Sequence, residues 1–75
     1  MKIKTFKVKR TGDLWETPAR KANGQKTLVP QGIYEVIRSL TIPRGSDPPE
    51  NGFVVEHNGQ EFIVLGIDCE LQDET

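Results

Sequence analysis

Apolar and polar residues alternate most clearly in the stretch GFVVEHNGQEFIVLGID, residues 52–68, where two apolar runs flank Asn58-Gly59. Asn-Gly favours a two-residue type I′ turn, because both residues tolerate a positive φ at low steric cost. Such a turn fixes the register of the two strands and predicts that Val55 lies opposite Phe62. Both faces of this hairpin are apolar away from the turn, which is typical of strands that pack on two sides.

The same register predicts Glu56 opposite Glu61. Two carboxylates in directly opposed positions repel each other. We therefore expect either a basic side chain beside this pair or full exposure of both carboxylates to solvent.

A strand rich in isoleucine, valine and tyrosine is predicted over residues 33–42. Pro30 and Gly32 suit the turn that precedes it, and Pro43 ends it. The next segment, PRGSDPPEN at 43–51, carries three prolines and a glycine. This composition predicts an exposed loop.

The N-terminal stretch MKIKTFKVKRT predicts a strand. Its dense lysines also suit an edge position, where they discourage pairing with other chains. A bulge near Thr5 would bring Ile3, Phe6 and Val8 to one face. The tail IDCELQDET begins as a short closing strand over residues 68–72.

Residues 11–31 fit more than one pattern. Thr17 suits a helix N-cap, Pro18 the first helical position, and Asn23 or Gly24 the helix end. Asn23-Gly24 also suits the turn of a second hairpin. We expect a long irregular loop here, with at most a short helical turn.

These elements predict an all-β fold with one domain over residues 1–75, a small five-stranded barrel with a long irregular first loop. A barrel is expected because closure removes exposed strand edges. The order of strands and loops resembles an SH3-like barrel. The acidic first loop and paired aromatics of signalling SH3 domains are absent, so recognition of proline-rich peptides does not follow from this resemblance. An OB-like barrel is disfavoured, because the chain lacks room for its inserted helix.

The core of this barrel is expected to hold the large apolar side chains of the predicted strands. They are Val36, Ile37, Phe53, Phe62, Ile63, Val64 and Leu65.

Composition narrows the class of protein. No apolar run approaches the roughly 18 residues that a membrane span needs, and the N-terminus lacks the apolar stretch of a secretory signal. The single cysteine, Cys69, excludes an internal disulfide. We expect no membrane association and a reduced, cytoplasmic setting.

Charge is distributed unevenly along the chain. Residues 1–26 hold eight basic residues against Asp13 and Glu16, a net charge of +6. Residues 27–75 hold Arg38 and Arg44 against nine acidic residues, a net charge of −7. Either the two parts attract each other and their fields cancel, or the first part presents a basic surface that steers an anionic partner.

No residue pattern predicts catalysis or a bound metal or cofactor. A metal site needs three or four convergent ligands, and the hairpin register places His57 and the glutamate pair on opposite faces. Cys69 would need a base beside it to act as a nucleophile. His57 is expected at the other end of a strand, about 30 Å away. We therefore expect a protein that is not an enzyme.

Candidate binding residues gather in the first loop. Trp15 either covers an open end of the barrel or anchors an interface, since Trp and Arg dominate interface hot spots. Arg20, Lys21 and Lys26 would surround it with positive charge, and Arg44 of the second loop would lie alongside.

The sequence thus predicts a small non-enzymatic binding module for an acidic protein surface, comparable with the small inhibitors or adaptors that phages and other mobile elements encode. The alternative is a small β-barrel that binds nucleic acid through its basic N-terminal third. The slightly negative total charge favours the protein partner, because nucleic-acid-binding domains usually have a pI above about 9. The pattern favours no particular oligomeric state.

Overall fold

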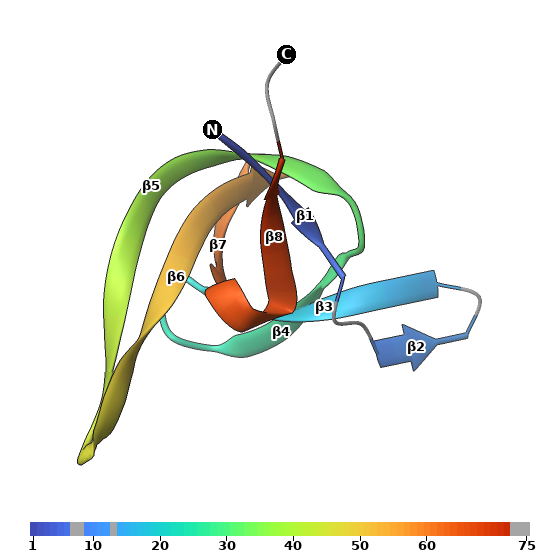
Figure 1. The fold of residues 1–75 in the computed structure, drawn as a ribbon. Helices are drawn as coiled ribbons and strands as arrows, with labels where there is room; N and C mark the ends of the chain where they lie inside the picture. Colours follow the sequence, from blue (N-terminus) through green and yellow to red (C-terminus); the bar gives the residue numbers. More distant parts are fainter. Residues whose placement is uncertain (7–8, 13, 73–75) are drawn as a thin grey trace.

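A computed structural model describes residues 1–6, 9–12 and 14–72, which form eight strands and one 3-10 turn, η1 (Gly66–Asp68) (Figure 1). The strands are β1 (Lys2–Thr5), β2 (Lys9–Thr11), β3 (Leu14–Lys21), β4 (Lys26–Pro30), β5 (Ile33–Arg44), β6 (Asp47–His57), β7 (Gln60–Leu65) and β8 (Cys69–Gln72). All pairings between them are antiparallel. The all-β prediction is confirmed.

Strand β5 connects two groups of strands. Its first residues pair with β1, which also pairs with β8. Its later residues pair with β6, which pairs with β7, and β7 pairs with β3. Figure 1 shows β5 curving from the first group to the second. Strand β3 also pairs with β2 and β4.

The described strands do not close into the predicted barrel. Among them, no ladder joins β8 at one end of the sheet to β2 or β4 at the other. The segment expected as an irregular loop supplies strands β3 and β4 instead, and β7 pairs with β3 rather than with a strand of the β1 group. The sheet therefore stays open between these described strands.

The core lies between the two groups of strands. Its buried apolar side chains are Ile3, Ala19, Val29, Val55, Phe62, Val64 and Cys69, with Tyr34, Val36 and Phe53 packed against them. They come from both groups, so packing between the groups depends on nearly the whole length of the chain.

The β6–β7 hairpin forms as predicted. Asn58 and Gly59 have φ angles of 52° and 78°, which suit a type I′ turn. Val55 lies opposite Phe62. Glu56 lies opposite Glu61, and the expected basic neighbour is Arg38, whose Nη2 lies 3.2 Å from Glu61 Oε1.

The irregular first loop was a wrong prediction for residues 14–30, which form the β3–β4 hairpin. Asn23 and Gly24 lie in the turn of this hairpin, as the alternative prediction of a second hairpin had it. The Gly24 amide donates to the Lys21 carbonyl, and the Lys21 amide donates to the Gln25 carbonyl, both at 2.9 Å. Gly24 has a φ of 85°, which matches a three-residue hairpin loop that ends in a left-handed residue.

Pro18 lies inside β3 rather than at a helix start. Lys21 and Gln25 are a hydrogen-bonded pair, so alternation along the ladder makes Pro18 and Leu28 a non-hydrogen-bonded pair. The Pro18 nitrogen therefore faces away from β4. On that side β2 pairs with residues 14–16 and β7 with residues 19–21, so the missing amide hydrogen breaks no ladder bond.

Replacing Gly24 by alanine should lower the free energy of unfolding by about 1–2 kcal/mol, because an L-residue pays this cost in the left-handed region. In the described chain no atom lies within 4 Å of the Cβ position, so the cost is backbone strain alone. Gly24→Asn should cost less, since asparagine tolerates this region. Urea denaturation measures both values. Equal losses in the two variants would contradict this account.

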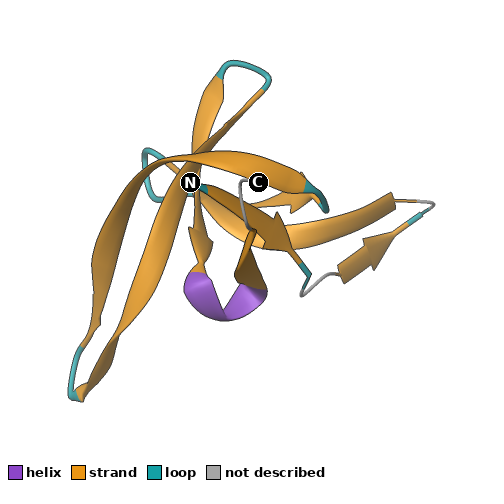
Figure 2. Ribbon diagram, turned by 45° about the horizontal axis from the view of Figure 1, so that its top comes forward, coloured by secondary structure: helices purple, strands orange, loops and turns teal. Residues whose placement is uncertain are grey.

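The prediction of an exposed loop at 43–51 was also wrong, because most of this segment belongs to two paired strands. β5 runs to Arg44, Gly45 and Ser46 make a tight turn, and β6 starts at Asp47. The result is a projecting hairpin, here called the arm, which Figure 2 shows extending from the body. The start of β6 is paired on one edge only, since β7 reaches only residues 52–57 of β6. The β5–β6 register is also irregular between Ile42 and Arg44, beside Pro48 and Pro49, so the adjacent prolines are tolerated.

The prediction that Ile37 lies in the core was wrong, because β5 has a bulge at this residue. The β5–β6 register shifts between Val36 and Arg38, and this shift reverses the faces of the rest of β5. Ile37 is 46% exposed instead of buried. Ile63 and Leu65, also predicted in the core, are half-buried on the other side of β7.

At the N-terminus, the inward residues are Ile3 and Thr5, both fully buried. Phe6 is 47% exposed, so the predicted bulge does not bring it inward. Val8 lies outside the described residues.

Candidate functional site

Side chains of the second group of strands alternate between the core and an outer face. In β3, Ala19 is buried opposite Val64 of β7, so Arg20 points outward, opposite Ile63. The outward side chains are a mixture of charged and apolar residues. Apart from charged positions they are Pro18, Leu28, Leu40, Ile42, Val54, Ile63 and Leu65.

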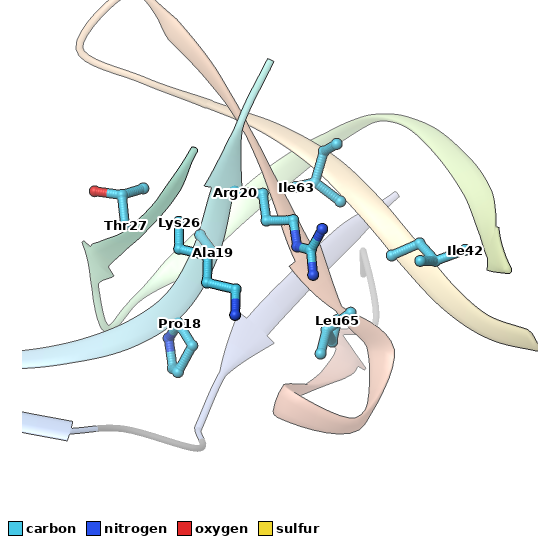
Figure 3. Close-up of a pocket in the computed structure, with 8 residues that line it drawn as sticks. All are labelled: Pro18, Ala19, Arg20, Lys26, Thr27, Ile42, Ile63 and Leu65. Atoms are coloured by element: carbon cyan, nitrogen blue, oxygen red, sulfur yellow. The ribbon is translucent and has the colours of Figure 1, made fainter. Parts of the chain in front are cut away.

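A groove of about 300 Å³ opens on this outer face between the β3–β4 hairpin and the base of the arm (Figure 3). It is lined by Pro18, Ala19, Arg20, Lys26, Thr27, Ile42, Ile63 and Leu65. Figure 3 shows the head groups of Arg20 and Lys26 pointing into the same space, with Pro18 and Leu65 beside it and Ile42 across from it. One side of the groove is therefore basic and the other is aliphatic.

The two cations of the groove are not neutralised within the described chain. Arg20 and Lys26 occupy directly opposed positions of β3 and β4, where like charges destabilise a sheet by up to about 1 kcal/mol. No ion pair of the described residues involves either side chain, whereas Arg38 pairs with Glu61 and Arg44 with Glu50. Positive charge kept at a cost to stability is more typical of a binding surface than of a folding element.

Gly52 permits the aliphatic wall of the groove to form. A Cβ at this position would lie 3.0 Å from Ile42 Cδ1, 3.1 Å from Leu40 Cδ1 and 3.4 Å from Ile63 Cγ2. These three side chains converge over the bare backbone of the glycine. A larger residue would push them apart and change the shape of the groove.

Of the predicted binding residues, the structure brings Arg20 and Lys26 together. Lys21 lies opposite Phe62 and faces the other side of β3. Trp15 is half-exposed and lies on β3 two residues before the buried Thr17, outside the groove. Arg44 lies next to the tip of the arm, where its guanidinium pairs with the Glu50 carboxylate.

The aliphatic half of the groove was missed because its residues match a core pattern. Ile63 and Leu65 are large, apolar and in a strand, so they were placed in the core. Alternation separates them from Phe62 and Val64, but the apolar character of both faces predicted packing on both sides of the hairpin, and only one side is the core. Finding Ile42 required the bulge at Ile37, which no sequence signal marks.

Cys69 and His57 have separate surroundings. The Cys69 thiol donates to the Leu65 carbonyl at 3.3 Å. Burial, reinforced by the negative charge of Asp68, raises the pKa of this thiol to about 11, so it is almost wholly protonated at neutral pH. The His57 ring packs edge-on against Tyr34, with ring centroids 5.9 Å apart, and lies near Phe62. Burial raises the pKa of the Tyr34 hydroxyl.

No group of three or more His, Cys, Asp or Glu side chains is placed to hold a metal ion in residues 1–6, 9–12 and 14–72. Across the same residues, no helix has the length and apolar character to cross a membrane.

Comparisons with known proteins found no relative of this chain. No protein family, curated protein or solved structure matches this chain.

Proposed function

We propose that this protein is a small non-enzymatic binding module that engages an acidic protein surface through the groove. The observation that carries the proposal is the unneutralised Arg20–Lys26 pair beside a half-buried aliphatic wall. Carboxylates of a partner would make charge-assisted hydrogen bonds with this pair. The wall adds apolar area of the kind found at the centre of protein interfaces. Such a module would act as an inhibitor or adaptor in the cytoplasm.

The strand order supports a further part of this proposal, that the fold is an opened form of an SH3-like barrel. Strand β1 lies between β8 and the start of β5, and β5, β6 and β7 follow one another as neighbours. The β3–β4 hairpin occupies the place of the long first loop.

The surroundings of Cys69 and His57 support a non-enzymatic role. A nucleophilic cysteine needs a lowered pKa and a base within hydrogen-bonding distance. The pKa of Cys69 is instead raised, and its thiol lies against the backbone carbonyls of Leu65 and Gly66. His57 contacts the rings of Tyr34 and Phe62 and the side chain of Asn58.

Nucleic acid is the second candidate ligand, favoured by the net charge of +6 in residues 1–26 and by the half-exposed Trp15, which could stack on a base. The outer face argues against it. Glu56 and the ion-paired Glu61 lie on the same side of the sheet as Ile63, so the positive charge of Arg20 and Lys26 does not continue along the face as a phosphate backbone would require.

The proposal predicts that Arg20→Glu/Lys26→Glu weakens binding to a fluorescein-labelled copolymer of glutamate and tyrosine by about tenfold or more. Both charges face the groove, and reversing them replaces attraction by repulsion. Fluorescence anisotropy measures the affinity. Circular dichroism should show an intact fold, because exposed charges contribute little to stability.

The matched control is Lys2→Glu/Lys4→Glu, which changes net charge equally at exposed positions of β1. It should alter the affinity less than about threefold. Equal weakening by both variants would show a diffuse charge effect and no site at the groove. Tighter binding to single-stranded oligo-dT than to the copolymer would favour nucleic acid instead.

A further inference from the structure

The groove presents its charge and its apolar surface at a fixed spacing. Lys26, Arg20, Ile63 and Val54 lie in one row across β4, β3, β7 and β6, because each is the register partner of the next. Neighbouring strands are about 4.8 Å apart. The midpoint between Lys26 and Arg20 is therefore about one and a half strand spacings, or about 7 Å, from Ile63.

The next row of the same face is apolar throughout. It contains Leu28 opposite Pro18, and Gly52 opposite both Leu65 and Leu40. Leu65 and Pro18 both line the groove. An apolar side chain placed over Ile63 would thus also contact Leu65, while a carboxylate at the start of the first row would meet two cations.

An extended peptide places alternate side chains on one side, about 7 Å apart. This distance equals the separation between the Arg20–Lys26 pair and the aliphatic wall. We infer that the groove recognises an extended segment of a protein partner in which an apolar residue and an Asp or Glu are two positions apart, running across the strands. This inference rests on the proposed function and specifies its ligand.

Two observations favour this segment over a polyanion. The positive charge is confined to one end of the row, since Arg38 at the far end is paired with Glu61. The centre of the face offers only aliphatic contacts, which a sugar-phosphate chain cannot use. One carboxylate next to one apolar side chain fits both facts.

The test uses three short labelled peptides of identical composition, which contain Leu and Glu separated by one Ser, placed adjacent, or separated by four residues. The Leu-Ser-Glu peptide should bind at least about fivefold more tightly than the other two, a difference of about 1 kcal/mol. Arg20→Gln/Lys26→Gln should remove this preference, and Lys21→Gln should keep it. Ile63→Thr should also reduce it, with circular dichroism confirming the fold.

The possible results are distinct. Equal binding of the three peptides, with binding of the glutamate-tyrosine copolymer still dependent on Arg20 and Lys26, would overturn the spacing rule and leave the proposed function standing. Failure of all peptides and of the copolymer would overturn both. A preference for Leu-Ser-Glu that survives Arg20→Gln/Lys26→Gln would place the peptide site elsewhere.

Discussion

Phe62→Ala should lower the free energy of unfolding by about 3–5 kcal/mol, the usual cost of removing a buried aromatic ring. Phe62 is 7% exposed and belongs to the core cluster that joins both groups of strands. Its ring also ends a chain of ring contacts that runs from Tyr34 through His57. A domain of this size has little stability to spare, since total values are about 5–15 kcal/mol.

The melting temperature should fall by at least about 12 °C, because 1 kcal/mol corresponds to at least about 4 °C in a domain of this size. The matched control is Ile37→Ala at the bulge, where the side chain is 46% exposed. The free energy of unfolding of that variant should stay within about 0.5 kcal/mol of the value for the natural protein. A Phe62→Ala protein that melts together with the control would show that Phe62 is peripheral to the core.

The parts of the fold that could be predicted are those fixed by local chemistry. The turn at Asn58-Gly59 needs only two residues that tolerate positive φ, and the alternation on both sides then sets the register. The opposed Glu56 and Glu61 even predicted their basic neighbour, although not that it would be Arg38.

Proline misled the prediction in two places. Pro18 suggested a helix start, and the prolines of residues 43–51 suggested a loop, because a ladder normally needs each backbone amide. Both segments are strands. The Pro18 nitrogen faces an edge of β3 where the described strands form no ladder bond at that residue, and Pro48 and Pro49 lie where β6 has one paired edge and an irregular register. Whether a strand edge lacks a neighbouring strand is decided only in the assembled sheet, so it cannot be read from the sequence of either segment alone.

The candidate site was half predictable for a related reason. Arg20 and Lys26 stand out by charge, but a two-residue turn at Asn23-Gly24 would have placed Lys21 opposite Lys26. The observed three-residue loop places Arg20 there instead. The aliphatic wall depends on which face each strand turns outward. That choice changes within β5 at the bulge, where Val36 packs against the core and Leu40 lies on the outer face.

Thr5→Val should lower the free energy of unfolding by about 1–3 kcal/mol, although valine keeps the shape of threonine. Thr5 is fully buried, and its hydroxyl accepts a hydrogen bond from the Gly32 amide at 2.9 Å and donates one to the Gly32 carbonyl at 3.2 Å. The carbonyl keeps a bond from the Thr5 amide at 2.9 Å. The Gly32 amide, which is partly buried, loses its hydrogen bond to the Thr5 hydroxyl, and leaving such a donor unsatisfied costs desolvation free energy.

Thr17→Val is the matched control, since Thr17 is equally buried but its hydroxyl has no hydrogen-bond partner in the described chain. The substitution removes a polar group that is buried without a hydrogen bond to the described residues. The free energy of unfolding should therefore stay the same or rise by up to about 3 kcal/mol. Urea denaturation of the two variants isolates the hydrogen bonds, because shape, burial and chemical change are the same. A Thr17→Val protein that loses as much stability as Thr5→Val would show that threonine at both sites acts through packing alone.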